Sequence, residues 1–308
     1  MRKLVLNIIM IFFVLSQLFI GNNISAQCVN ADFSLGDFTN WTGSVGENQS
    51  GVYAVTGISM VPGTSNTISY ATALGRQTIM NQPNTDPNTA NMLSVLPPNG
   101  SSSCRLGNPR TAGCDGSNPQ AERIEYSYMV TDASRIFMYQ YAVVLQLSED
   151  NPLDERPKFT IYILDSLGAI VNSTNGYYEV IASTGISGFI TCQPAFDDCK
   201  TDNVVWKDWT SVDVDLSDYI GQNVKVQFTT YDCDPGNAGG YFGYAYISCS
   251  CGMLNDIIEN DNNSFIQIFP NPGKGIYTLT LGNIPGNDLN IEIYNSLGGL
   301  CIVALRIH

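Results

Sequence analysis

Hydrophobic and polar residues alternate along most of this chain, which is the pattern of β-strands. Between Phe137 and Leu145 the odd positions carry large apolar or aromatic side chains, and the even positions are mixed. This period of two, with its aromatic and β-branched residues, predicts a strand within residues 130–146. Further strands are predicted at residues 159–164, 204–214, 224–230 and 241–247. The turn Asp165-Ser166-Leu167-Gly168 predicts a hairpin in which residues 169–171 return beside the strand 159–164.

Clusters of Gly, Pro, Asn and Asp separate these segments, and no long amphipathic helix pattern appears. Many short strands joined by such turns predict an all-β fold, a jelly-roll-like β-sandwich over residues 28–251. The loop-rich stretch 81–119 accounts for much of its length. Residues 252–264 are rich in Asn, Asp and Glu and are expected to form a linker. A second, smaller β module is expected from residue 265 to residue 308.

The first 26 residues have the order of a secretory signal peptide. Arg2 and Lys3 precede an apolar run over residues 4–20, and Ser25-Ala26 supplies the small residues of a cleavage site. An uncleaved membrane anchor is the alternative, since the run is just long enough to span a bilayer. No later run is apolar enough, so no stable transmembrane segment is expected after removal of the signal.

The chain is acidic, which limits its partners. Its formal net charge is −14, and loss of Arg2 and Lys3 with the signal peptide makes it −16. Such a surface disfavours nucleic acid and anionic lipid, because both are recognised through fields of Lys and Arg. It suits a soluble extracellular protein.

Nine cysteines in an exported chain indicate disulfides, and we expect at least three. Short spacing favours Cys104–Cys114 and Cys192–Cys199, each of which would close a polar loop. Cys249 and Cys251 are two residues apart, so on a strand they point to the same side and should take separate partners. Cys28 and Cys233 remain as candidates, and Cys301 is the odd one. Zinc is disfavoured because no Cys-x-x-Cys spacing exists and His308 is the sole histidine.

Catalytic motifs are scarce. A Ser-His-Asp or Cys-His site needs a histidine near a nucleophile, and His308 lies at the terminus. No phosphate-binding or dinucleotide-binding glycine motif is present. The nearest approach to the paired carboxylates of a glycosidase is the loop from Glu149 to Glu155, which includes Asp154. Acidic loop residues of this kind are usually solvated, so a non-enzymatic protein is the leading prediction.

Two kinds of binding site are considered. Calcium prefers oxygen ligands, and Asp232 and Asp234 lie in an oxygen-rich loop before the last strand, with Asp32 expected on a neighbouring first strand. A structural calcium there competes with a plain turn as the interpretation. Aromatic side chains could instead stack on sugar rings. The candidates are Trp206, Trp209, Tyr241, Tyr244 and Tyr246, with the two tryptophans expected on opposite faces of their strand. Aromatic residues of sandwiches more often lie in the core.

The C-terminal stretch resembles a known family. Its residues include Phe269-Pro270-Asn271-Pro272, then Gly275, and later Ile293-Tyr294-Asn295 followed by Gly298. They resemble the C-terminal sorting domain of type IX secretion cargo, an Ig-like β-sandwich that directs export across a Gram-negative outer membrane. The resemblance implies the type IX machinery as a partner and a secreted or cell-surface location reached through the periplasm. Here it ends at Gly298 with ten residues following, so we expect a partial sandwich that is exported poorly.

Residues 28–251 resemble a β-sandwich module of large surface and gliding-associated proteins that use the same route. The resemblance rests on motifs such as Asn30-Ala31-Asp32-Phe33, Cys104-Arg105-Leu106-Gly107-Asn108 and Gly240-Tyr241-Phe242-Gly243-Tyr244. It implies a fold but no activity. The leading hypothesis is therefore an exported, non-enzymatic adhesion or glycan-binding protein, with polysaccharides or surface glycans as partners. The alternatives are a sandwich-type polysaccharide hydrolase and a structural spacer in a surface layer.

Overall fold

The structure is a computed structural model of the 308-residue chain. It describes residues 28–63, 75–109, 119–171, 174–195, 202–233 and 240–252, together with the backbone of four strands beyond residue 264. The chain forms two compact units. The first comprises Met1–Thr210 and Val214–Met253, and the second comprises Ser211–Asp213 and Leu254–His308. Each unit is described by itself.

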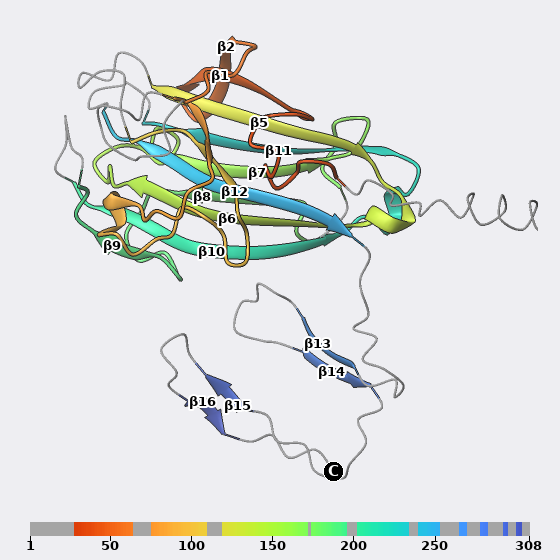
Figure 1. The fold of residues 1–308 in the computed structure, drawn as a ribbon. Coiled ribbons are helices and arrows are strands. Elements are labelled where there is room, and N and C mark those ends of the chain that lie inside the picture. The colour runs from red at the N-terminus through yellow and green to blue at the C-terminus, as the bar shows by residue number, and fades with distance from the viewer. Residues whose placement is uncertain are drawn as a thin grey trace, which may run out of the picture. The chain divides into compact units, whose positions relative to one another are not determined.

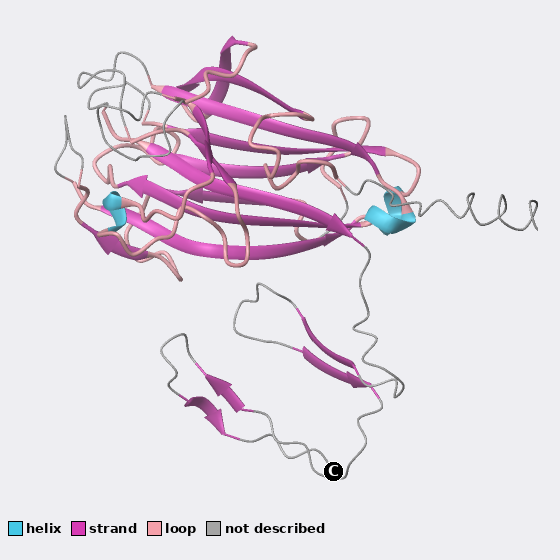
Figure 2. Cartoon of the chain, viewed as in Figure 1, coloured by secondary structure: helices cyan, strands magenta, loops and turns pink. Residues whose placement is uncertain are grey.

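The first unit contains two six-stranded antiparallel sheets (Figures 1 and 2). Sheet A has the order β2-β1-β5-β11-β7-β8 and comprises β2 Val52–Gly57, β1 Trp41–Gln49, β5 Gln120–Met129, β11 Asn223–Tyr231, β7 Lys158–Leu164 and β8 Tyr177–Ile181. Sheet B has the order β3-β4-β12-β6-β10-β9 and comprises β3 Gln77–Met80, β4 Ser103–Leu106, β12 Gly243–Gly252, β6 Ile136–Gln146, β10 Val204–Asp215 and β9 Ile190–Cys192. Three short 3-10 helices join them: η1 Pro87–Thr89, η2 Asp132–Ser134 and η3 Ser217–Tyr219.

The two sheets form a β-sandwich, as predicted. The chain alternates between them, from β5 in sheet A to β6 in sheet B and back to β7, and again along β10, β11 and β12. Such alternation is typical of jelly-roll-like sandwiches. In Figure 1, β5, β11 and β7 lie in one layer, with β12, β6 and β10 in the other.

Aromatic side chains from both sheets fill the interior between them. Tyr139 and Tyr141 of β6 face sheet A, with ring centroids 6.1 Å from Phe228 and 5.7 Å from Phe159 respectively. Trp41 continues this core, 6.2 Å from Phe228. The odd positions of β6 therefore point inward, as the alternating pattern predicts.

The segment before β1 is held against this core by hydrogen bonds. Asn30 donates through Nδ2 to the carbonyl oxygens of Asp37 and Thr39, and its Oδ1 accepts from the Leu35 amide. Phe33 stacks on Trp41 with ring centroids 4.6 Å apart. The Asn-Ala-Asp-Phe motif thus holds the segment before β1 in place and packs it against Trp41.

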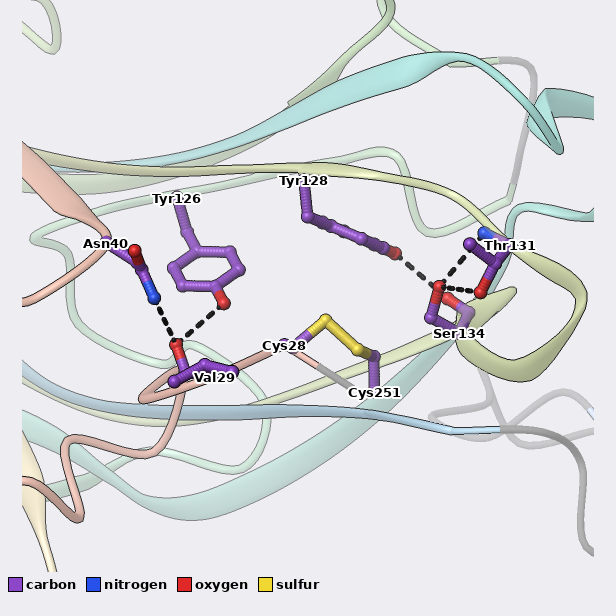
Figure 3. The surroundings of a disulfide bond; sticks show 8 residues. All are labelled: Cys28, Val29, Asn40, Tyr126, Tyr128, Thr131, Ser134 and Cys251. Atoms are coloured by element: carbon purple, nitrogen blue, oxygen red, sulfur yellow. Dashed lines mark hydrogen bonds between the residues drawn. A yellow bond between two sulfur atoms is a disulfide. The ribbon is translucent and has the colours of Figure 1, made fainter. Parts of the chain in front are cut away.

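A disulfide fastens the same segment to the end of β12. Cys28 and Cys251 are bonded across 223 residues of sequence, with Cα atoms 5.8 Å apart. Beside the bond, the carbonyl oxygen of Val29 accepts hydrogen bonds from Asn40 Nδ2 and the Tyr126 hydroxyl (Figure 3). Cys251 and Cys28 were both candidates for a bridge, and this pair was one of the open possibilities.

The predicted hairpin is present in shortened form. The Asp165 side chain accepts from the amides of Leu167 and Ala169, and Gly168 has the positive φ of 81° that a glycine tolerates in such a turn. The returning residues make only an isolated bridge, between Leu164 and Ile170, rather than a strand.

The second unit contains two small antiparallel sheets. One pairs β13 Phe265–Phe269 with β14 Thr278–Gly282, and the other pairs β15 Glu292–Tyr294 with β16 Leu300–Val303. Of the predicted sorting motif, the backbone of Phe269, Ile293 and Tyr294 lies in these strands. Pro270, Asn271, Pro272, Gly275, Asn295 and Gly298 lie outside the described residues, as do the predicted signal peptide and the residues just after Gly252. Within the described part of the chain, no helix is long and apolar enough to cross a membrane.

Candidate functional site

The aromatic residues predicted to bind sugar lie mostly in a second core, on the outer face of sheet B. Trp206, Tyr244 and Tyr246 belong to one buried cluster with Met80, Leu93, Val95, Ala142, Val144, Val204 and Phe242. Trp206 is only 3% exposed and both tyrosines are fully buried. Tyr241 is also buried, and burial raises its pKa to about 12. These four side chains do not form an open sugar-binding surface.

Trp209 is the partial exception. It is half-buried against the same cluster, 6.4 Å from the Tyr246 ring, and its indole N–H donates to the Ser94 carbonyl. Trp206 and Trp209 therefore contact one cluster, and the prediction that they lie on opposite faces is wrong. The two tryptophans are three residues apart, so a regular strand would point their side chains to opposite faces; β10 departs from this alternation between them.

The loop segment 81–102, which we call the strap, covers this face of sheet B. Asp86 anchors it: its Oδ2 accepts hydrogen bonds from the hydroxyls of Tyr244, at 2.8 Å, and Tyr246, at 2.9 Å. Asp86 Oδ1 accepts from the Asn88 amide, which caps helix η1. Burial raises the pKa of Asp86, and these hydrogen bonds partly offset the rise. The strap thus buries the aromatic side chains on the outer face of sheet B.

The acidic residues predicted to bind calcium are not brought together. Asp32 lies in an exposed turn, where its side chain accepts from the Ser34 amide, and not on a strand as expected. Asp232 is buried and accepts from the Gly243 amide at the start of β12. The Ala31 carbonyl, next to Asp32, accepts from the Cys249 amide, six residues further along β12. At about 3.3 Å per residue these two points are about 20 Å apart.

The prediction that Asp32 and Asp232 share one calcium site is therefore wrong. Asp234 lies outside the described residues, and a calcium site of Asp232 with Asp234 stays a prediction. Within the described residues, no group of three or more His, Cys, Asp or Glu side chains could hold a metal ion.

Asp232 belongs instead to a buried acidic group. Glu122 is 2.6 Å from Arg76 through Oε1 and accepts from Thr230 through Oε2. Burial, and secondarily the negative charge of Glu122, raises the pKa of Asp232 well above its usual value. Both carboxylates are buried, so a change in their protonation with pH changes the stability of the fold.

The predicted local disulfides are not formed. Cys104 and Cys192 are thiols in the structure, as is Cys249; this leaves five of the eight candidate cysteines, so the expectation of at least three bridges among them is wrong. Cys104 is fully buried and pairs in register with Ile247, which places its side chain in the core between the sheets. Burial raises the Cys104 pKa to about 12. Cys192 donates to the Asn88 carbonyl beneath the strap. Cys114 and Cys199 lie outside the described residues, and Cys233 Sγ accepts from Asn151.

The acidic loop from Glu149 to Glu155, which was considered for hydrolysis, is held in place by hydrogen bonds between Glu149 and Thr184. Glu149 Oε1 accepts from both the amide and the hydroxyl of Thr184. The side-chain bond and then the backbone bond lower the pKa of Glu149, whereas a general acid needs a raised one. Asp154 and Glu155 lie in the turns that follow. This loop therefore has a structural role that its hydrogen bonds explain.

The outer face of sheet A presents a different set of side chains, which we call the tyrosine face: Tyr53, Tyr162, Tyr177, Tyr231, Arg123 and Lys158. Strand register brings them together. Glu125, Gln227, Tyr162 and Tyr177 form one row across β5, β11, β7 and β8. Arg123, Thr229, Thr160 and Glu179 form the next row, and Ala121, Tyr231, Lys158 and Ile181 form the third. The intervening residues, such as Ile124 and Phe228, face the interior.

Three of the four tyrosines of this face are partly open to solvent, and Tyr231 is buried. Tyr177 is 44% exposed and lies 4.9 Å from the half-buried Tyr162 ring. Tyr53 is half-buried and meets Tyr231 edge-on at 6.3 Å. Burial raises the pKa of Tyr177 to about 12. At neutral pH its hydroxyl is therefore uncharged and can both donate and accept a hydrogen bond.

The hairpin of β1 and β2 turns over one side of the tyrosine face. Lys158 Nζ donates to the Gly51 carbonyl at the hairpin turn and lies 4.6 Å from the Tyr231 ring centroid. Gly46 permits this close approach, because a Cβ there would lie 2.4 Å from the Ala54 carbonyl oxygen and 2.9 Å from the Tyr53 ring. The hairpin thereby places Tyr53 over Arg123, with 4.0 Å between the guanidinium carbon and the ring centroid.

The sequence pattern did not single out this face. Its signal is the alternation of Lys158, Thr160 and Tyr162 with Phe159, Ile161 and Ile163 along β7. That pattern separates the two faces of the strand but does not tell which aromatic face of the protein stays uncovered.

Comparison with known proteins gives little further guidance. No protein family matches the sequence, and no curated protein resembles it. Among solved structures, TmCBM61 in complex with β-1,4-galactotriose is similar over 72% of this chain and 94% of its own, with 8% identity and a TM-score of 0.30. The enzymatically active domain of tailspike protein 4 of bacteriophage CBA120 is similar over 73% of this chain and 21% of its own, with 13% identity and a TM-score of 0.33. Both TM-scores are below 0.5, so neither likeness bears on the function of this chain.

Proposed function

We propose that this chain is an exported, non-enzymatic glycan-binding protein, used for adhesion, that binds through the tyrosine face. The observation that supports it is a pair of neighbouring tyrosine rings on the outer face of sheet A, the exposed Tyr177 and the half-buried Tyr162, with polar side chains in the same row. Sugar rings pack their C–H groups on aromatic faces, and Tyr hydroxyls with Arg, Lys, Gln and Glu side chains bond their hydroxyls. Tyr162 and Tyr177 supply the exposed rings, with Gln227 and Glu125 in the same row.

Export is part of the same proposal. It is supported by the order of residues in the first 26 positions and by the type IX sorting motif from Phe269 to Gly298. Fractionation of a Gram-negative host that has the type IX machinery tests it. The proposal expects the chain outside the cell or in the periplasm, and retention of the whole chain in the cytoplasm contradicts it.

A glycan array of the purified chain tests the binding function. We expect the chain to bind at least one class of polysaccharide on the array. We also expect it to support adhesion of cells that carry this polysaccharide. Tyr177→Ala should weaken that binding about two- to tenfold, the range expected for loss of one aromatic contact. Tyr219→Ala, on helix η3 outside the tyrosine face, is the matched control and should bind as the wild type does. Silence on the array and in adhesion contradicts the proposal and favours the structural-spacer alternative.

A further inference from the structure

We infer that the tyrosine face takes glycans that carry carboxylate groups, such as polyuronates, and that Arg123 binds the carboxylate. The inference rests on the proposed function above and names the ligand class of the same face.

Arg123 is held in a fixed orientation at the middle of the face. Its Nε donates to the Thr229 hydroxyl at 3.0 Å, and its guanidinium lies over the Tyr53 ring. Its positive charge partly offsets the rise that burial causes in the pKa of both Tyr53 and Tyr231. The guanidinium is therefore close to two tyrosine side chains.

The other cations of this face have carboxylate partners within the protein. Lys158 Nζ lies 4.0 Å from Glu179 Oε2, and Lys225 Nζ lies 3.4 Å from Glu125 Oε2. Glu125 also accepts from Gln227, so it is occupied twice. The ion pairs found among the described residues do not include Arg123. On this face it is the cation without a described acidic partner.

A half-buried, oriented guanidinium suits a carboxylate. Its planar fork can donate two parallel hydrogen bonds to the two carboxylate oxygens, which a lysine ammonium cannot match. Because Thr229 and Tyr53 already hold the side chain, little conformational freedom is lost when a ligand binds. The neighbouring tyrosine rings would then stack on the sugar that bears the carboxylate.

The acidic net charge of the chain does not oppose such a site. Charges further away than a Debye length, about 8 Å at physiological salt, are largely screened. The acidic side chains of the same face, Glu125 and Glu179, are paired with Lys225 and Lys158, and these ion pairs reduce their repulsion of a carboxylate at Arg123.

The test measures binding of the purified chain to polygalacturonate and to the same polymer after carboxyl reduction, which differs only in that group. We expect carboxyl reduction to weaken binding about tenfold or more, as loss of a charge-assisted bidentate pair predicts. Arg123→Gln should cause a similar loss for polygalacturonate only. Lys207→Gln, another cation near an aromatic ring but on β10, is the matched control and should change neither. Thermal melting confirms that each variant is folded.

Each outcome distinguishes the two proposals. Equal binding of both polymers overturns the carboxylate inference and leaves glycan binding standing. Equal binding of polygalacturonate and dextran sulfate, unaffected by Arg123→Gln, shows unspecific charge attraction and also overturns the inference. Binding to neutral glycans alone overturns it too, and binding to no glycan overturns both proposals.

Discussion

The hydroxyl of Tyr246 donates a 2.9 Å hydrogen bond to the carboxylate of Asp86, a residue 160 positions earlier in the chain. Tyr244 donates to the same oxygen atom at 2.8 Å. These bonds hold the strap on sheet B and bury the aromatic residues that look most suited to sugar binding. Among the described residues, partly exposed tyrosine rings remain on the tyrosine face of sheet A, where Tyr177 is 44% exposed.

Removing the Asp86 carboxylate should destabilise the fold. Asp86→Ala leaves the Tyr244 and Tyr246 hydroxyls buried without their acceptor, which costs about 1–3 kcal/mol of unfolding free energy. Urea denaturation measures it, with the exposed Asp218→Asn as a control that should stay near zero. If Asp86→Ala were as stable as the control, the strap would not depend on this anchor.

How much of this could be predicted from sequence depends on the range of the interactions. Alternation within 137–145 predicted β6, and the Asp-Ser-Leu-Gly turn predicted the bend after β7, because both depend on neighbours in the chain. The strap has no hydrophobic period of its own, and its anchor joins Asp86 to Tyr246 across the fold. The sequence pattern therefore could not show that the strap buries most of the sugar-binding candidates.

The same limit applies to the cysteines. Short spacing favoured Cys104–Cys114, but spacing does not show that Cys104 points into the core between the sheets. The Cys28–Cys251 bond joins the two ends of the sandwich domain, and only the folded topology brings them together.

The stability of the fold should fall as pH rises through the titration of Asp232. Burial raises the pKa of this group in the folded state, so between its unfolded value, about 4, and its folded value the folded protein binds more protons. The stabilisation is complete below about pH 4 and is lost as pH rises through the folded pKa. In Asp232→Asn, which keeps an oxygen for the Gly243 amide, this loss should disappear. Urea unfolding at several pH values compares the slopes; identical slopes for wild type and variant would contradict the shift.

Loss of the Cys28–Cys251 disulfide should lower stability by about 2–5 kcal/mol, the range typical for a native bridge. The double variant Cys28→Ser with Cys251→Ser should melt at the same temperature as the reduced wild type. Cys192→Ser is the control and should leave the effect of reductant unchanged. Peptide mapping that finds Cys28 bonded to another cysteine would contradict this assignment.

Gly46→Ala should disturb the tyrosine face without touching its residues. The added methyl group would meet the Ala54 carbonyl and the Tyr53 ring, so the hairpin must shift away from Arg123. We expect weaker glycan binding with a modest loss of stability. Gly168→Asn, in the turn after β7 where a side chain meets no atoms within 4 Å, is the control. Unchanged binding by Gly46→Ala would show that Tyr53 does not contribute to the face.

Hydroxyl-radical footprinting, with and without a saturating glycan from the array, locates the binding surface on the intact chain. We expect Tyr162 and Tyr177 to be oxidised less when the glycan is present, and the oxidation of Trp209 to be unchanged. Protection of Trp209, with Tyr162 and Tyr177 oxidised as before, would place the ligand beside the strap on sheet B and contradict the assignment of the tyrosine face.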